Sequence, residues 1–353
     1  MPPFGLELDE FKDLVRQQTR STVDVSEDDV IDLVARVTDR EVTAVERDAV
    51  GAAGGVTFFA SVRGREPDVV VQVAHPEAAP GLHKGTVLYR HVGDCTEVRT
   101  PAVAALDPDP TDFAGAYAVV ERIPGYSPEG EHEPLSRNAR RRVLSDLGRV
   151  LGEVHREVTF EGFGQVAPTS DRRVDVDDPH ETWTSHLTER LDRQREVAAG
   201  TPVEDLVERA YDHAVGGLAD LSDPRVGSLL HQDLRPGNVV VEDGRLAALV
   251  DWDGAVAGDP AFDLHRAQQG FADETDDEAG RESLRNVLYE GYTAIRDLPP
   301  ALERRREVYD AAGMVGVARP LVMAREHLDR EVTDDDIAAT RQEMASRLDS
   351  LGA

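Results

Sequence analysis

The spacing of the apolar residues changes near residue 123, and this change limits the fold more than any other feature of the sequence. Before it lie short runs rich in β-branched residues, such as 69–73 (VVVQV), which are typical of strands. After it apolar residues recur every three or four positions, beginning with Val143, Leu144 and Leu147, which is typical of amphipathic helices. Strands that come first and helices that follow favour an α+β fold over alternating βαβ units.

We therefore predict two lobes, a small β-rich N-terminal lobe over residues 1–122 and a larger, mostly helical C-terminal lobe over residues 123–353. The first forty residues have a helical pattern, in which Ser26 and Asp29 have the spacing of a capping box. The N-terminal lobe is then expected to contain several strands and one helix. The strands are predicted at 41–50, 56–62, 69–74 and 117–122, and the helix at 81–92. One compact β-like section, residues 229–253, interrupts the helices of the C-terminal lobe.

The charge of the chain excludes several classes of partner. It has 69 acidic and 39 basic residues, which gives a formal net charge of −30 at pH 7. Such a surface repels phosphate backbones and anionic lipids, so we expect neither nucleic acid nor a membrane as a partner. Lysine occurs only at Lys12 and Lys84. An acidic, lysine-poor composition resembles that of halophilic proteins, in which ions screen the repulsion, and we interpret it as a property of the solvent rather than of the substrate.

Other bulk features exclude further classes. The single cysteine, Cys95, excludes an internal disulfide framework and a multi-cysteine metal site. The N-terminus lacks the basic start and apolar run of a secretion signal. No stretch approaches the roughly 18 consecutive apolar residues of a membrane span. We therefore expect a cytoplasmic protein, whose oligomeric state the sequence leaves open.

One segment, residues 229–264, carries a pattern with a chemical meaning. His231, Asp233 and Asn238 fit the spacing H-x-D-x-x-x-x-N, and Asp251 follows. From the composition, about 0.01 chance matches to the first three positions are expected. Phosphoryl transfer needs this combination, because one carboxylate must orient the attacking hydroxyl and accept its proton. A second carboxylate and an amide oxygen must hold magnesium across the nucleotide phosphates.

The residues between Asn238 and Asp251 predict a hairpin. Two apolar runs, VVV and LAALV, flank the step Asp243-Gly244, which is a strong signal for a tight turn. Such a hairpin would return Asp251 to the side of Asn238, as two ligands of one metal ion require. The spacing therefore favours a phosphoryl-transfer site that contains Asp233, Asn238 and Asp251.

These motifs resemble the catalytic and metal-binding segments of the aminoglycoside phosphotransferase and choline kinase-like family, whose members have a protein-kinase-like two-lobed fold. Carried over to this sequence, the resemblance implies that Asp233 is the catalytic base and that Asn238 and Asp251 bind magnesium. It implies a phosphotransferase that moves the γ-phosphate of ATP, or of GTP, to a hydroxyl of a small molecule. Antibiotic acceptors are one branch of this family, and nothing in the sequence indicates them.

Other parts of the chain resemble the same family with lower specificity. Asp259 and Asp263 fall in its downstream block, and we interpret them as helix-capping or buried hydrogen-bonding groups. Residues 119–125 are similar to the family's hinge between the lobes, where backbone groups meet the purine. The resemblance therefore implies that Glu121 and Ile123 contact the nucleotide.

The N-terminal lobe departs from the family where a phosphate-binding lysine is expected. Gln72 takes the place of that lysine on the strand, and Lys84 takes the place of its glutamate partner on the next helix. Either Lys84 has taken over the positive charge, with Gln72 as a weaker phosphate ligand, or Lys84 is a solvated side chain. A shifted alignment is the remaining alternative, in which an arginine binds the phosphates. The candidates are Arg63, Arg65 and Arg90.

A turn of small residues, 51–55, precedes the second predicted strand. Its position favours a phosphate contact through the backbone N–H groups of Gly54 and Gly55, and an ordinary hairpin turn is the alternative.

Two other functions compete with phosphotransfer. One is a nucleotide- or metabolite-binding protein with the same fold and little transfer activity, for which Gln72 is the support. The other is a metal-dependent hydrolase that uses Asp233 and Asp251 without a nucleotide. The acceptor stays open, because acidic residues occur throughout the chain and an acidic cleft would therefore carry no information.

Overall fold

The computed structural model describes residues 23–48, 55–63, 68–129, 135–271, 278–317 and 333–353 of the 353-residue chain. Contacts divide the chain into two compact units. Among the described residues, the first lies within Thr19–Pro179 and Val226–Leu298, and the second lies within His180–Arg225 and Pro299–Ala353. The predicted lobe boundary after residue 122 lies inside the first unit and stays a prediction. The fold is mixed α+β, as the sequence predicts.

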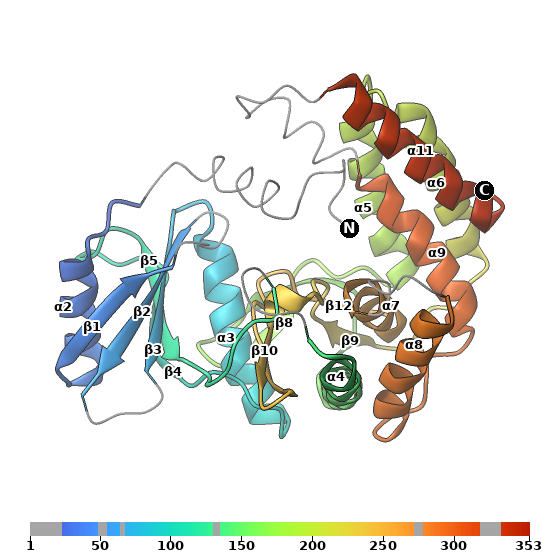
Figure 1. Cartoon of the computed structure of the whole chain (residues 1–353). Helices are drawn as coiled ribbons and strands as arrows, with labels where there is room; N and C mark the ends of the chain where they lie inside the picture. The colour runs from blue at the N-terminus through green and yellow to red at the C-terminus, as the bar shows by residue number, and fades with distance from the viewer. Residues whose placement is uncertain (1–22, 49–54, 64–67, 130–134, 272–277, 318–332) are drawn as a thin grey trace. The chain divides into compact units, whose positions relative to one another are not determined.

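The N-terminal part of the first unit is an antiparallel sheet with the strand order β1-β2-β3-β5-β4 (Figure 1). Its strands are Val42–Arg47 (β1), Gly55–Val62 (β2), Val69–Ala74 (β3), Val103–Asp107 (β4) and Ala116–Glu121 (β5). The four predicted strands are confirmed, whereas β4 was not predicted. Its five residues, VAALD, include two alanines, which have a low strand propensity.

Two helices lie on opposite sides of this sheet (Figure 1). Helix α2, Glu27–Thr38, begins with the predicted capping box, and its buried face packs on strand residues that include Phe58 and Val71. Helix α3, Ala79–Cys95, confirms the helix predicted over 81–92. Successive side chains of a strand point to opposite faces. Since Val71 of β3 packs in the α2 core, its neighbour Gln72 lies on the side of the sheet where α3 runs.

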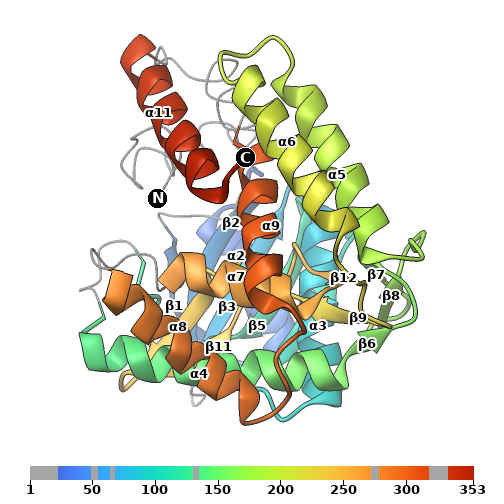
Figure 2. The same cartoon turned by 90° about the vertical axis from the view of Figure 1, so that its right-hand side faces the viewer.

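The remainder of the first unit contains helices α4 (Arg137–Glu157), α7 (Pro260–Phe271) and α8 (Glu278–Thr293). Helices α4 and α8 lie side by side (Figure 2). Gly148 of α4 touches the carbonyl of Leu288, and Gly291 of α8 touches the carbonyl of Ser145. A side chain at either glycine would collide with the facing backbone, so the close packing of this helix pair requires both.

The same part contains a hairpin and a second sheet. The predicted hairpin is confirmed as Val239–Glu242 (β10) and Arg245–Leu249 (β11), joined by Asp243 and Gly244, both with positive φ. The second sheet has the order β6-β9-β12-β7-β8. Its strands are Thr159–Phe160 (β6), Gly164–Pro168 (β7), Val174–Val176 (β8), Gly227–Leu230 (β9) and Val256–Gly258 (β12). Strands this short carry too few residues for a periodic pattern, so most of this sheet was not predicted.

The second unit is helical. Its elements are Trp183–Ala198 (α5), Glu204–Ala219 (α6), Leu302–Val315 (α9) and Asp334–Leu351 (α11), and α5 lies beside α6 (Figure 2). The buried Trp183 donates its indole N–H to the hydroxyl of Tyr309 at 3.0 Å, which joins α5 to α9. Among the described residues, no helix has both the length and the apolar character that crossing a membrane would require.

Candidate active site

The loop of residues 231–238 joins β9 to β10 and carries two of the predicted site residues. It ends in a 3-10 turn, Pro236–Asn238, which points the Asn238 side chain back toward Asp233. The Asn238 amide N–H group donates to the backbone carbonyl of Asp233 and to its Oδ2, both at 2.8 Å. The amide oxygen of Asn238 accepts no hydrogen bond from the residues that the structure describes, so it is available to a ligand.

The hairpin brings Asp251 to the same place. The N–H of Val250 donates to the Asn238 carbonyl at 3.0 Å, so the residue after it, Asp251, lies next to the 231–238 loop. Asp251 has a φ of 67°, a left-handed conformation that is uncommon for non-glycine residues. The structure therefore brings together the three residues for which the sequence predicted catalysis and metal binding.

The Asp251 carboxyl lies among other carboxylates. Although the residue is reached by solvent, exclusion of water by the surrounding protein raises its pKa, and the negative charges of Asp253 and Asp233 raise it further, to about 7. Arg235 opposes this rise. A carboxyl held in this environment is relieved of repulsion either by a proton or by a cation.

Asp233 has the opposite electrostatic environment. Burial favours its protonated form, but the positive charge of Arg235 and hydrogen bonds from Arg235 and Asn238 outweigh that effect and place the pKa below its usual value. The Nε of Arg235 lies 3.0 Å from Asp233 Oδ2, and its Nη1 lies 2.6 Å from Oε2 of Glu129. Asp233 is therefore a carboxylate at neutral pH. The contact with Glu129 was not predicted, because no spacing in the sequence relates these two positions.

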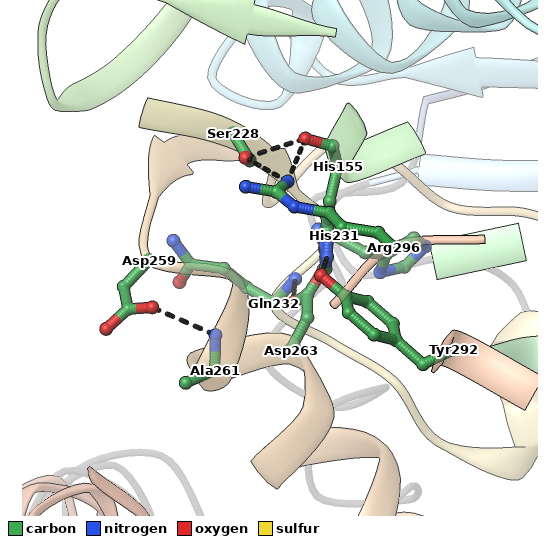
Figure 3. A network of polar contacts seen from close by, with 9 residues as sticks. All are labelled: His155, Ser228, His231, Gln232, Asp259, Ala261, Asp263, Tyr292 and Arg296. Atoms are coloured by element: carbon green, nitrogen blue, oxygen red, sulfur yellow. Dashed lines mark hydrogen bonds and ion pairs between the residues drawn. The ribbon is translucent and has the colours of Figure 1, made fainter. Parts of the chain in front are cut away.

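A buried network fixes the backbone of the 231–238 loop (Figure 3). Asp263 of α7 accepts the N–H of His231 at 2.7 Å and the N–H of Gln232 at 2.8 Å. His155 Nε2 lies 3.3 Å from the same carboxylate, and its Nδ1 lies 3.2 Å from the hydroxyl of Tyr292. The interpretation of Asp263 as a buried hydrogen-bonding group is confirmed. It holds the loop through the two backbone groups that precede Asp233.

Two more contacts complete this support. Asp259 accepts the N–H of Ala261 at 3.0 Å and so caps α7, as predicted (Figure 3). The Nε2 of His231 lies 2.8 Å from the carbonyl of Val250, and its ring packs on Trp252 with 4.7 Å between centroids. His231 thereby ties the 231–238 loop to the chain on both sides of Asp251.

Of the two glycines and the glutamine predicted to contact the nucleotide, Gly55 and Gln72 lie in the N-terminal sheet. Gly54 lies outside the described residues, whereas Gly55 is the first residue of β2 and touches the carbonyl of Val73. A side chain at Gly55 would collide with that carbonyl, so the pairing of β2 with β3 already requires glycine there. Gln72 lies in the middle of β3, between Thr57 and Ala118 of the neighbouring strands.

The predicted hinge residues follow at the end of β5. The carboxylate of Glu121 accepts the N–H of Ala102 at 3.1 Å and pairs with Arg99 at 3.3 Å, so this side chain supports the neighbouring chain. Ile123 is buried, and in the described part of the chain its backbone N–H and carbonyl have no hydrogen-bond partner. The nucleotide contacts assigned to these residues stay predictions.

Lys84 lies against the chain that follows Asp251. Its Nζ donates to the carbonyl of Ala255 at 3.2 Å, and the side chain is half-buried. Burial lowers the pKa of Lys84, and the negative charge of Asp253 opposes that shift. Of the alternatives for Lys84, the one in which it is a solvated side chain is therefore excluded.

Of the arginines considered as alternatives, two are engaged away from the site. Arg63 pairs with Glu41 at 2.8 Å, and Arg90 donates to the carbonyl of Asp171 at 3.0 Å. Arg65 lies outside the described residues.

Comparison with known proteins places the chain in a family. A model described as the phosphotransferase enzyme family matches residues 48–308. Hygromycin-B 4-O-kinase of Escherichia coli is 24% identical over 194 residues, which are 53% of this chain and 52% of that protein. The chain therefore matches about half of the length of this curated relative.

Solved structures share the fold over nearly the whole chain. Aminoglycoside phosphotransferase APH(4)-Ia has a TM-score of 0.68 and 17% identity, covering 93% of this chain and 100% of that one. Macrolide 2'-phosphotransferase MphH from Brachybacterium faecium has a TM-score of 0.60 and 19% identity, covering 91% and 98%. A thermostable mutant of APH(4)-Ia, with a TM-score of 0.67 and 17% identity over 92% of this chain and 99% of that one, forms a ternary complex with AMP-PNP and hygromycin B. Since the family model covers well over half of the sequence, the chain belongs to the phosphotransferase enzyme family.

Proposed function

We propose that this protein transfers the γ-phosphate of ATP, or of GTP, to a hydroxyl of a small molecule. The observation that carries the proposal is the convergence of Asp233, Asn238 and Asp251 from two loops onto one site. The relatives support the same class of reaction, since one is a kinase of hygromycin B and another was crystallised with AMP-PNP and hygromycin B. ATP is therefore the nucleotide that we favour.

The donor atoms of the site suit Mg²⁺. Asn238 offers a free amide oxygen, and Asp251 offers a carboxylate whose pKa is raised by exclusion of water and by neighbouring carboxylates, a repulsion that a divalent cation would relieve. No group of three or more His, Cys, Asp or Glu side chains within the described ranges is arranged to hold a metal ion by itself. Mg²⁺ typically binds to one or two protein ligands together with substrate phosphates, so Asn238 and Asp251 would hold it jointly with the nucleotide. When bound, Mg²⁺ would neutralise charge on the phosphates.

The residues of the chain then have separate tasks. Asp233 orients the acceptor hydroxyl and accepts its proton, and the contacts from Arg235 and Asn238 keep it ionised and aimed. The low pKa of Asp233 makes it a weak base, which suits a reaction in which positioning contributes more than proton abstraction. The nucleotide contacts that we propose, besides the two metal ligands, come from Gly54, Gly55, Gln72, Glu121 and Ile123.

A second candidate function keeps the nucleotide and removes the transfer. Gln72 carries no charge at the position where the resemblance leads us to expect a lysine, which favours a nucleotide-binding protein with little transfer activity. The intact set of Asp233, Asn238 and Asp251 favours the kinase. The two functions differ in turnover and agree in nucleotide binding, so they can be separated experimentally.

The discriminating experiment is a coupled nucleotide-consumption screen against sugars, amino alcohols and amino sugars, with ATP and GTP in parallel. The net charge of −30 favours a salt-rich cytoplasm as the working environment, so the screen should run in molar KCl. We expect Mg²⁺-dependent consumption with at least one acceptor class. Clear nucleotide binding without consumption across the panel would instead favour the binding protein.

Two variants test the assigned roles. Asp233→Asn should lower kcat by about 10³-fold while the nucleotide affinity stays within about threefold, because the base acts only in the chemical step. Asp251→Asn should weaken Mg²⁺-dependent nucleotide binding by about tenfold or more in calorimetry, and leave binding without Mg²⁺ unchanged. Retained turnover in Asp233→Asn would exclude this residue as the base.

A further inference from the structure

One face of α3 packs on the loop of residues 251–255. A Cβ built on Gly85 would lie 3.3 Å from the backbone N of Asp253, and one on Gly81 would lie 3.6 Å from the Asp253 Cβ. Positions 81 and 85 are four residues apart and therefore share one side of the helix. At position 85 a side chain would be tighter against the loop backbone than usual, whereas at position 81 it would make an ordinary contact.

Two polar side chains of the same helix hold the two ends of the loop. The hydroxyl of Tyr89, which is buried, accepts the N–H of Asp251 at 3.2 Å. Lys84 Nζ donates to the carbonyl of Ala255 at 3.2 Å. Lys84 also faces the negative charge of Asp253, which lies between the two contacts. Both ends of the 251–255 loop are thus fixed by α3.

These contacts bear on the residue that we propose as a metal ligand. Asp251 has a left-handed backbone, with a φ of 67°, a conformation that persists only where the surroundings hold it. Its N–H has the Tyr89 hydroxyl as its partner, and without that hydroxyl it would have none among the residues that the structure describes. The direction of the Cα–Cβ bond of Asp251 follows from this backbone conformation, so whatever fixes the backbone also determines the region that the carboxylate can reach.

We propose that Lys84 and Tyr89 are positioning residues that hold Asp251 in the conformation needed to bind Mg²⁺. The proposal rests on the proposed function and deepens it, because it assigns a task to Lys84, whose role the sequence left open. Strand β3 has no charged side chain, because Gln72 is neutral, so β3 cannot form an ion pair with α3. Helix α3 instead contacts the 251–255 loop directly.

The first test measures the loop itself, in the ligand-free full-length protein in molar KCl. Tyr89→Phe removes only the hydroxyl, and Lys84→Met removes only the charged end of a half-buried side chain, so both variants should fold. We expect amide hydrogen exchange in a peptide covering 250–256 to become about tenfold faster in each variant, because the opening of this segment becomes easier. Lys84→Arg keeps the positive charge and should restore most of the protection.

A control removes the hydroxyl of another tyrosine in the same unit. Tyr117 lies on β5, where its ring packs edge-on against Phe113. Tyr117→Phe should leave exchange in 250–256 unchanged. If exchange in this peptide is also unchanged in Tyr89→Phe and in Lys84→Met, the positioning role is excluded.

The second test measures the consequence for the metal. In titrations of nucleotide binding with Mg²⁺, Tyr89→Phe and Lys84→Met should each raise the Mg²⁺ concentration at half-saturation by about tenfold, which corresponds to about 1.4 kcal/mol. Nucleotide affinity in EDTA should not change, and a purely structural loss would lower it as well. Equal Mg²⁺ midpoints in wild type and both variants would overturn the proposal. The two proposals can fail separately. If the wild type shows no Mg²⁺-dependent nucleotide binding, the proposed function is overturned. Faster exchange in Tyr89→Phe and Lys84→Met would still support the positioning of the loop.

Discussion

The two loops of the candidate active site are held by different kinds of contact. The backbone of the 231–238 loop is held by Asp263 of α7, a fully buried carboxylate that in turn contacts His155, which contacts Tyr292. The 251–255 loop is held from α3 by Tyr89 and Lys84 through single hydrogen bonds to its backbone, and two of its residues, Asp251 and Asp253, are solvent-exposed.

This difference predicts which property each loop controls. Removal of one partner from a buried polar network leaves other groups without partners. A substitution in the network that holds the 231–238 loop should therefore mainly lower the free energy of unfolding. A lost neutral hydrogen bond to the backbone of the 251–255 loop should cost less stability, about 1 kcal/mol. It frees the backbone of Asp251, so it should mainly change the affinity for Mg²⁺.

The largest expected effect comes from Asp263→Asn. The carboxylate accepts two backbone N–H groups and lies beside His155, so its replacement should lower the free energy of unfolding by about 3 kcal/mol. Urea unfolding followed by tryptophan fluorescence measures this loss. Asp94→Asn, which breaks the exposed pair with Arg172, is the matched control and should cost less than about 1 kcal/mol. Equal losses in the two variants would remove the distinction between the loops.

An intermediate effect is expected from Tyr292→Phe, which makes in the buried network the same chemical change that Tyr89→Phe makes at the 251–255 loop. Loss of the hydroxyl that contacts His155 should lower the free energy of unfolding by about 1 kcal/mol. The Mg²⁺ midpoint for nucleotide binding should stay at the wild-type value. A shifted midpoint in Tyr292→Phe would show that the two loops are coupled rather than separately held.

The smallest expected effect is a change in the pH dependence of stability. Burial lowers the pKa of His231 below its usual value, and its buried Nδ1 has no hydrogen-bond partner in the described structure. The unfolded chain therefore binds a proton more readily than the folded one, so the stability contributed by neutral His231 is present above about pH 6.5 and is lost as the pH falls below it.

The measurement compares wild type with His231→Gln, which cannot titrate, in urea unfolding at pH 7.5, 6.5 and 5.5. The wild type should lose more stability over this range than the variant does. Other histidines with lowered pKa values, such as His186 at about 4, act equally in both proteins and cancel in the difference. Parallel curves would show that the pKa of His231 in the folded protein is not lowered.

The sequence predicted those parts of the fold and site that depend on neighbouring residues. The capping box at Ser26, the strand 69–74 and the hairpin turn at Asp243-Gly244 were predicted correctly, because cap, alternation and turn signals act within a few residues. The proximity of Asn238 and Asp251 was also predictable from the hairpin. Its turn fixes the register of the two strands, and that register places the residues at their ends side by side.

The parts that were missed lack such local signals. Strand β4 and most strands of the second sheet are short. The pair of Glu129 with Arg235 joins two positions that lie far apart in the sequence. The sequence left the role of Lys84 open for the same reason, since its contact with Ala255 depends on how α3 packs.

The sequence by itself determined the fold class, the three candidate site residues and the hairpin between two of them. The tertiary structure decided which groups support them. Asp263 and His155 support the 231–238 loop, and Tyr89 and Lys84 support the 251–255 loop. Local signals specify φ and ψ over a few residues. A hydrogen bond between positions as distant as Lys84 and Ala255 exists only after helices and sheets have packed, and its partners follow from that packing.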